Sequence, residues 1–310
     1  MNADSDKPGS EMRLAQPSRA RAAIRRERGL PYLLVAPAVA VLLALSIYPL
    51  VYLVKVAFQT GSGDAVRWTF ANFERLASDG FFLTALWHTL VYAATALTFE
   101  FLLGLGLALL LDRSIRGRAV FRAILLIPMM LPSVVVGVVW RLMLNPTSGA
   151  INGTLQGAGM NTDRLTWTAS TALALPSVIA VDVWQWTPFM FLVLLAGLQA
   201  IPQEPYEAAL IDGSSAWQTF RHVTLPLLRP AILIALLLRT MDLFRVFDQI
   251  FILTQGGPGN ATETVSLYVY RTAFRFSDFG YAAAMSFVLL AMTNVVSLIY
   301  IRLLQRQEPA

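Results

Sequence analysis

The chain has 310 residues, of which 56% are hydrophobic and only 14% are charged. Soluble domains carry about 25% charged residues, so this shortage of charge, set out in long apolar runs, indicates an integral membrane protein. The chain has no cysteine, which excludes disulfides and Cys-based zinc or iron–sulfur sites, and its 2 histidines cannot build a His-rich metal site.

The chain begins with a polar, basic tail. Residues 1–29 predict a cytosolic segment that is largely disordered up to about Arg19. The basic stretch "RARAAIRRER" that follows could form a helix on anionic lipid, or it could serve only to set the topology. The apolar run Pro31–Val54 is longer than the core of a signal peptide, so we predict a retained first span.

Further apolar segments predict five more spans, because a helix needs about 20 apolar residues to cross the hydrocarbon core. They are Leu86–Leu111, Val120–Met143, Ala172–Leu198, Leu227–Leu253 and Phe279–Tyr300. Leu227–Leu253 departs from the apolar pattern because it contains Arg239, Asp242, Arg245 and Asp248. Its apolar entry, Ala231–Leu238, and its apolar exit, Ile250–Leu253, nevertheless favour a span.

The formal net charge of +5 is best explained by membrane topology. With six spans, most Lys and Arg residues fall on the side of both termini, as the positive-inside rule requires of the cytosolic side. A five-span chain would place the basic C-terminus outside. We therefore predict an all-α membrane protein with six transmembrane helices and both termini cytosolic. Its parts are the tail 1–29, a transmembrane domain 30–304 and a short cytosolic tail 305–310. Because topology accounts for the positive charge, the charge does not favour nucleic-acid binding.

A polar insert, Glu207–Pro226, separates the fourth and fifth spans. "YEAALID" favours a short helix, Asp212-Gly213 favours a turn, and a serine after it can cap a second short helix. Pro226 suits the first turn of the next span. The insert carries apolar residues that need cover, so it could dock another protein or lie on the membrane ends of its own chain.

"EAALIDGSSAWQTFRHVTLP" resembles the EAA motif of bacterial ABC importer permeases, E-A-A-x-x-x-G followed by I-x-L-P. The matching residues are Glu207, Ala208, Ala209, Gly213, Leu225 and Pro226, with Val223 in place of the isoleucine. Trp184–Pro202 and Phe251–Phe274 are similar to MalF/UgpA-type sugar permeases, and the likeness covers about residues 30–304.

The resemblance implies a type I ABC importer permease fold and a set of partners. These partners are a second, MalG-like permease, two copies of a cytosolic ATPase that binds ATP and Mg²⁺, and an extracytoplasmic solute-binding protein. It also implies that segment 204–226 holds the coupling helix, with Glu207 meeting a basic residue of the ATPase. The residues expected to take part are Glu207, Ala208, Ala209, Leu210, Asp212, Gly213, Trp217 and Phe220.

ATP binding itself is not expected in this chain. A Walker A loop ends in Gly-Lys-Ser/Thr, and the two lysines of this chain, Lys7 and Lys55, follow Asp and Val. We therefore predict a permease that is not an enzyme and has no cofactor of its own.

The expected transport path lies on two polar helix faces, because ionisable groups inside a membrane usually face a cavity or a partner. The residues are Asp182, Gln185, Trp186 and Phe189 in the fourth span, and Arg239, Asp242, Arg245, Asp248 and Gln249 in the fifth. Carboxylates, amides and flat aromatic rings suit a sugar. The same residues could instead pair with one another and only hold the spans together. His88 and Glu100 are expected to be structural.

An importer of a sugar, with a disaccharide such as trehalose or maltose favoured by likeness to actinobacterial trehalose-type importers, is the leading hypothesis. Glycerol-3-phosphate or a polyol is an alternative cargo, although a dianion should require excess positive charge in the path. A proton-coupled secondary transporter that uses Asp182 or Asp242 as a relay is an alternative of another class. It leaves the polar insert unexplained, and the inverted repeats of such transporters are not evident.

Overall fold

The computed structural model describes residues 17–60, 67–112 and 116–305, with side chains from residue 34 on. The chain divides into two compact units, Met1–Lys55 and Val56–Ala310. Most of helix α1 (Pro17–Ala57) belongs to the first unit, and its segment Leu34–Ala57 is long and apolar enough to cross a membrane. The helix already begins at Pro17, inside the stretch for which we predicted a largely disordered tail.

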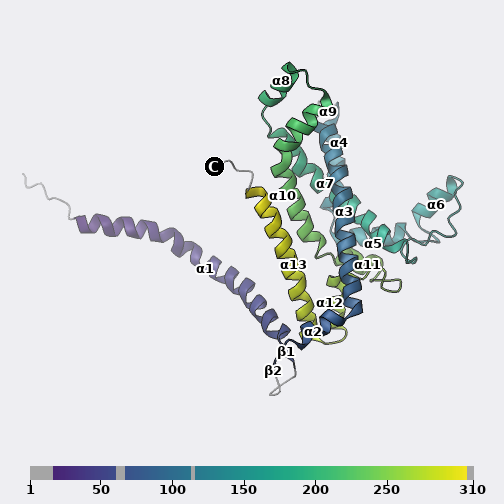
Figure 1. Ribbon diagram of the computed structural model, residues 1–310, viewed down its shortest axis with the longest axis horizontal. Coiled ribbons are helices and arrows are strands. Elements are labelled where there is room, and N and C mark those ends of the chain that lie inside the picture. The colour runs from purple at the N-terminus through teal and green to yellow at the C-terminus, as the bar shows by residue number, and fades with distance from the viewer. Residues whose placement is uncertain (1–16, 61–66, 113–115, 306–310) are drawn as a thin grey trace, which may run out of the picture. The chain divides into compact units, whose positions relative to one another are not determined.

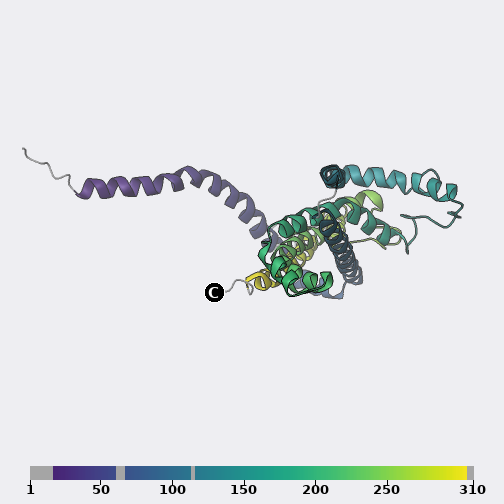
Figure 2. The ribbon, with the colours of Figure 1, turned by 90° about the horizontal axis from the view of Figure 1, so that it is seen from above.

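The second unit is a bundle of helices in which elements distant in sequence lie side by side (Figure 1). Its elements in chain order are β1 (Gln59–Thr60), β2 (Arg67–Trp68), α2 (Ala71–Ser78), α3 (Gly80–Asp112), α4 (Arg118–Met130), α5 (Ser133–Met143), α6 (Ala150–Gly157), α7 (Ala174–Gln199), α8 (Glu204–Ile211), α9 (Ala216–Thr219), a π-helical turn (Phe220–Thr224), α10 (Leu225–Leu243), α11 (Asp248–Leu253), α12 (Val265–Phe274) and α13 (Phe279–Gln305). The two short strands pair antiparallel, with Gln59 opposite Trp68. Figures 1 and 2 both show α5 and α6 reaching away from α3, α7, α10 and α13.

Five helices of the described residues are long and apolar enough to cross a membrane, and a bent pair, α4 and α5, makes six if it counts as one span. This agrees with the predicted all-α class and the predicted six spans. Figure 1 places α8 and α9 at one end of the bundle, and α2 and α12 at the other.

The predicted third span, Val120–Met143, is not one straight helix. The chain turns by 95° between α4 and α5, at Leu131 and Pro132. Proline cannot donate a backbone hydrogen bond and disfavours helical geometry in the residue before it, so a break at this point has a local cause. The Leu131 carbonyl exposed by the break accepts a hydrogen bond of 3.0 Å from Nε2 of Gln185.

The predicted fifth span, Leu227–Leu253, also needs correction at both ends. The helix is continuous from Ala216 to Leu243, because the π-helical turn joins α9 to α10, so Pro226 does not start a separate helix. A π turn closes its backbone hydrogen bonds over five residues instead of four, and such single turns occur inside α-helices. At the other end, α10 stops at Leu243, and Ile250–Leu253 belongs to the separate helix α11.

The break after α10 contains no glycine or proline. Two carbonyls within it, those of Phe244 and Val246, lie 3.5 and 3.4 Å from the hydroxyls of Ser266 and Thr264. Inside a membrane, freed backbone groups need such protein partners. The break therefore depends on residues that lie about 20 positions further along the chain, and a local pattern does not reveal it.

Close packing of α3 against α7 forms the centre of the bundle. A side chain at Gly104 would meet the Cβ of Met190 at 2.6 Å, so only glycine fits there. A second close approach, of Gly197 to Ala231, brings α7 against α10. Small residues at such crossings are the usual means of helix association in membranes. The three helices thus hold their polar side chains within reach of one another.

The end of α3 near α2 is fixed by Asp79, which is half-buried. Its Oδ2 accepts hydrogen bonds from the hydroxyls of Tyr268 (2.8 Å) and Tyr281 (2.5 Å), and its Oδ1 accepts from the backbone nitrogens of Phe81 and Phe82. Burial raises the pKa of Asp79, but these hydrogen bonds outweigh it and hold the pKa below its usual value. One carboxylate thereby caps α3 and ties it to α12 and α13.

Candidate functional site

Three charged side chains form a buried cluster where α3, α7 and α10 meet. Arg239 donates two parallel hydrogen bonds to Glu100, from Nε to Oε2 at 2.7 Å and from Nη2 to Oε1 at 2.9 Å, and Nη2 also contacts Oδ2 of Asp182. The side chains of Glu100, Asp182 and Arg239 are at most 3% exposed. Bidentate pairing is the strongest geometry between arginine and a carboxylate. The cluster therefore links three helices through charge.

Aromatic and amide side chains extend this cluster on both sides. The guanidinium carbon of Arg239 lies 4.9 Å from the ring centroid of Trp186, a cation–π contact. Gln249 donates to Oε1 of Gln185 at 2.7 Å and accepts from the hydroxyl of Tyr92 at 3.1 Å. Since Gln185 also binds the Leu131 carbonyl, the bends of α4–α5 and α10–α11 are joined through side-chain amides.

A cavity of about 360 Å³ opens beside the cluster. Its lining contains seven of the nine residues predicted for the transport path, which are Asp182, Trp186, Arg239, Asp242, Arg245, Asp248 and Gln249. The two faces that the sequence placed on separate helices thus meet around one cavity. Of the other two predicted residues, Gln185 is buried behind the cavity and bonds to Gln249, and Phe189 is half-buried and does not line it.

The charges of the fifth span are arranged differently from the prediction. The continuous helical face expected to carry Asp242, Arg245 and Asp248 ends at Leu243, and Asp248 starts α11. Asp242 and Arg245 do pair, at 3.0 Å, but both are exposed. Arg239 pairs with Glu100 and Asp182 on other helices instead. The buried charges are therefore paired between helices, with two carboxylates sharing Arg239, and the exposed pair borders the cavity.

Glu100, which we expected to be a lone polar residue with a structural role, is not alone but has a charged partner on another helix. It is 0% exposed and supplies both oxygens to Arg239, although it does not line the cavity itself. A carboxylate in the middle of an apolar span of 33 residues was the available signal, because such a group requires a partner. The sequence could not say that the partner is Arg239.

The predicted coupling segment forms a helical hairpin between α7 and α10. Helix α8 ends at Ile211, and Gly213 turns the chain with a φ of +70°, a conformation that favours glycine. Ser215 then caps α9 in a reciprocal arrangement with Gln218. The predicted helix–turn–helix is therefore present, with its second helix continuing into α10 as described above.

Most residues predicted for coupling lie on the surface of this hairpin. Leu210, Ile211 and Trp217 are 78%, 86% and 66% exposed. Glu207, Ala208, Asp212 and Gly213 are also exposed, whereas Ala209 is buried and Phe220 is half-buried. Leu210, Trp217 and Phe220 border a hollow of about 730 Å³ that reaches to Leu109 and Leu198. The hairpin thus presents apolar surface beside a hollow that the described residues leave open.

Comparison with known proteins agrees with this arrangement. Residues 100–309 match the family described as binding-protein-dependent transport system inner membrane component. The trehalose/maltose transport system permease protein MalF of Thermococcus litoralis is 37% identical over 280 residues, covering 89% of this chain and 94% of that protein. The trehalose transport system permease protein SugA of Mycobacterium tuberculosis is 35% identical over 290 residues, covering 91% of each chain.

A solved structure extends the likeness to the whole fold. One chain in the crystal structure of a bacterial ABC transporter involved in the import of the acidic polysaccharide alginate superposes with a TM-score of 0.80. It is 25% identical and the alignment covers 94% of this chain and 100% of that chain. The cargoes in these names include an acidic polysaccharide as well as disaccharides, so the likeness covers a class of carbohydrates.

Proposed function

Because the chain belongs to the family of binding-protein-dependent transport system inner membrane components and is a permease subunit of an ABC sugar importer, we propose that its cargo is a disaccharide of the trehalose or maltose kind. The observation that carries the proposal is the cavity of about 360 Å³, in which acids, an amide and an indole ring meet. Two relatives named for trehalose or for trehalose and maltose support the choice of disaccharide.

The chemistry of the cavity favours an uncharged polyhydroxyl compound. The hydroxyls of a sugar both donate and accept hydrogen bonds, so they fit carboxylate oxygens and the amide of Gln249, and the flat C–H face of the ring packs on Trp186. Three acids and two arginines line the cavity, which leaves no excess of positive charge. A dianion such as glycerol-3-phosphate would therefore meet net repulsion from this chain.

The hairpin of α8 and α9 supplies the proposed contact with an ATPase. Its exposed apolar residues need cover, and tryptophan is among the residues enriched in the hot spots of protein interfaces. Leu210, Trp217 and Phe220 would fill a groove on the ATPase, and Glu207 would meet a basic residue at its rim. The continuous helix Ala216–Leu243 then connects this contact to Arg239 at the central cluster.

We further propose the assembly that such coupling requires. It contains this chain, a second permease of the MalG kind and two ATPase subunits that bind ATP and Mg²⁺, and it receives the sugar from an extracytoplasmic binding protein. The hairpin and both termini then face the cytosol. The distribution of Lys and Arg along the chain supports this orientation.

The adjacent tryptophans Trp184 and Trp186 offer a matched test of the cavity. Trp186 lines it, whereas Trp184 is 41% exposed and packs edge-to-face on Trp140, 5.4 Å away. In proteoliposomes that contain the assembled transporter, we expect Trp186→Ala to raise the KM for the disaccharide about tenfold, the value of a lost aromatic contact of about 1.4 kcal/mol. Trp184→Ala should leave the KM near that of the wild type. Equal effects of the two substitutions would contradict the proposed site.

A further inference from the structure

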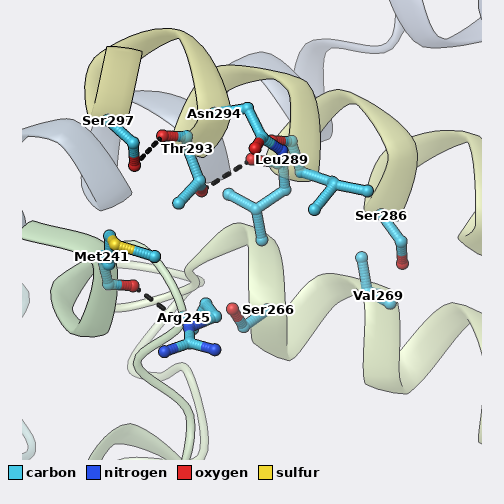
Figure 3. Close-up of a pocket in the computed structure, with 10 residues that line it drawn as sticks. Met241, Arg245, Ser266, Val269, Ser286, Leu289, Thr293, Asn294 and Ser297 are labelled. Carbon is cyan, nitrogen blue, oxygen red and sulfur yellow. Dashed lines mark hydrogen bonds between the residues drawn. The ribbon is translucent and has the colours of Figure 1, made fainter. Parts of the chain in front are cut away.

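A second cavity, of about 350 Å³, lies between α10, α12 and α13 (Figure 3). It falls within the range of about 300–1,000 Å³ that is usual for small-molecule sites. One wall is a stripe of polar residues on α13, and the facing wall carries Arg245. The lining residues are Met241, Arg245, Ser266, Val269, Ser286, Leu289, Leu290, Thr293, Asn294 and Ser297.

The α13 wall consists of groups that are ready to accept hydrogen bonds. Ser286, Thr293 and Ser297 each donate their hydroxyl proton to the carbonyl four residues earlier, at 2.8–2.9 Å. Their oxygens keep lone pairs that can accept from a ligand. Asn294 donates one amide hydrogen to the Leu290 carbonyl at 2.8 Å, and its side chain is exposed. This wall therefore suits a ligand that brings hydroxyl donors.

Arg245 connects this second cavity to the first, because its side chain borders both. Its Nε donates to the Met241 carbonyl at 3.1 Å and its Nη2 pairs with Asp242 at 3.0 Å, so its charge is largely balanced by an acid at the end of α10. A neutral ligand in either cavity can accept a hydrogen bond from the guanidinium without bringing a counter-charge. Asn294, in the middle of an apolar span, also indicates a polar neighbour, because exposing an amide to lipid is costly.

We propose that the cavity between α10, α12 and α13 is a second subsite for the same uncharged sugar, reached from the first past Arg245. This inference rests on the proposed function and adds to it where the sugar goes within this chain. The hydroxyl oxygens of α13 accept from the sugar, Arg245 donates to it, and Leu289 and Val269 pack against its apolar edge.

The chain contains no cysteine, which makes single-cysteine variants clean probes. In the assembled transporter, we expect Asn294→Cys to react with a membrane-impermeant, positively charged methanethiosulfonate. Millimolar amounts of whichever sugar the wild type transports should slow this reaction at least threefold. Val295→Cys and Leu298→Cys are the matched controls, because both residues are exposed on α13 outside the cavity. They should react at least tenfold more slowly, with no effect of sugar.

The same reaction separates the other possible occupants. If Asn294→Cys is as inert as the two controls, lipid or a helix of another subunit fills the cavity and the proposal is wrong. Reaction without protection by the transported sugar would equally overturn it.

As a second measurement, Asn294→Leu should raise the KM for uptake several-fold while the assembly still purifies intact, and an unchanged KM would contradict the proposal. Failure of the wild type to transport a disaccharide overturns only the proposed cargo, because the protecting sugar is defined by the wild type's own uptake.

Discussion

The central cluster of Glu100, Asp182 and Arg239 differs from the hairpin of α8 and α9 in how each region satisfies its energetically unfavourable side chains. At the centre, charged groups are at most 3% exposed and each has an opposite charge within the same chain. In the hairpin, Leu210 and Trp217 are apolar yet 78% and 66% exposed. The charges of the cluster are paired within this chain, whereas the apolar surface of the hairpin requires another molecule to cover it.

We therefore expect the stability of the fold to depend on the cluster and the assembly with other subunits to depend on the hairpin. A buried charge cluster makes the fold depend on every member, because one missing partner leaves a charge in a medium that cannot solvate it. An exposed apolar surface leaves the fold of the chain untouched and makes assembly depend on it. Substitutions in the two regions should therefore separate stability from association.

The largest effect is expected from Arg239→Met, which leaves Glu100 and Asp182 buried without a positive partner. Removing one side of a buried ion pair costs about 3–5 kcal/mol. We expect the purified chain to lose most of its thermal stability in detergent, measured by the temperature of unfolding. The control combines Arg239→Met with Glu100→Gln and Asp182→Asn. This neutral set should recover most of the loss, and a triple variant as unstable as the single one would argue against charge as the cause.

A smaller effect, on association alone, is expected from Trp217→Ala. Central interface tryptophans contribute about 2 kcal/mol or more, so affinity for the ATPase should fall about thirtyfold. The unfolding temperature of the isolated chain should stay unchanged, because Trp217 is 66% exposed. Trp68→Ala is the matched control, since Trp68 is 68% exposed and lies in β2, away from the hairpin. The prediction is wrong if both variants retain the ATPase equally on co-purification.

Asp79 is intermediate between the buried cluster and the exposed hairpin. It is a half-buried carboxylate that accepts hydrogen bonds but has no ion-pair partner among the described residues. Its pKa is lowered in the folded chain, so its contribution is present above the unfolded value of about 4 and is lost as the pH falls through the folded value. Asp79→Asn should therefore flatten the loss of stability between pH 5 and pH 3, and should cost no more than about 1 kcal/mol at pH 7. Identical pH profiles of the two proteins would contradict this.

The smallest change in stability is expected from Asp242→Asn. The Asp242–Arg245 pair is exposed, and such pairs contribute about 0–1 kcal/mol. Unfolding temperatures should therefore differ little from the wild type, whereas the KM for sugar should change because Asp242 lines the cavity. A large loss of stability would show that the pair belongs with the buried cluster.

The sequence predicts much of this molecule because its main constraint, apolar length, is local. It predicts the all-α class, the span count and the helix–turn–helix around Gly213. It also selects seven residues that meet at one cavity. The EAA-like motif adds the family resemblance, which the comparisons confirm.

What the sequence could not predict depends on contacts between distant segments. The end of α10 at Leu243 has no local breaker, and hydroxyls of Thr264 and Ser266 support it. Glu100 and Arg239 are 139 positions apart, so no helical spacing could pair them. The bend at Leu131 and Pro132 is partly readable from proline, but membrane helices also tolerate proline without turning by 95°.

The most direct test of the central claim is uptake in proteoliposomes that contain this chain, its partner permease, the ATPase and the binding protein. Labelled trehalose, maltose and glycerol-3-phosphate would be offered with and without ATP. We predict saturable, ATP-dependent accumulation of at least one disaccharide, abolished when Glu207→Ala and Trp217→Ala are combined, and no accumulation of glycerol-3-phosphate. Accumulation of glycerol-3-phosphate alone, or disaccharide uptake that persists without ATP, would contradict the account.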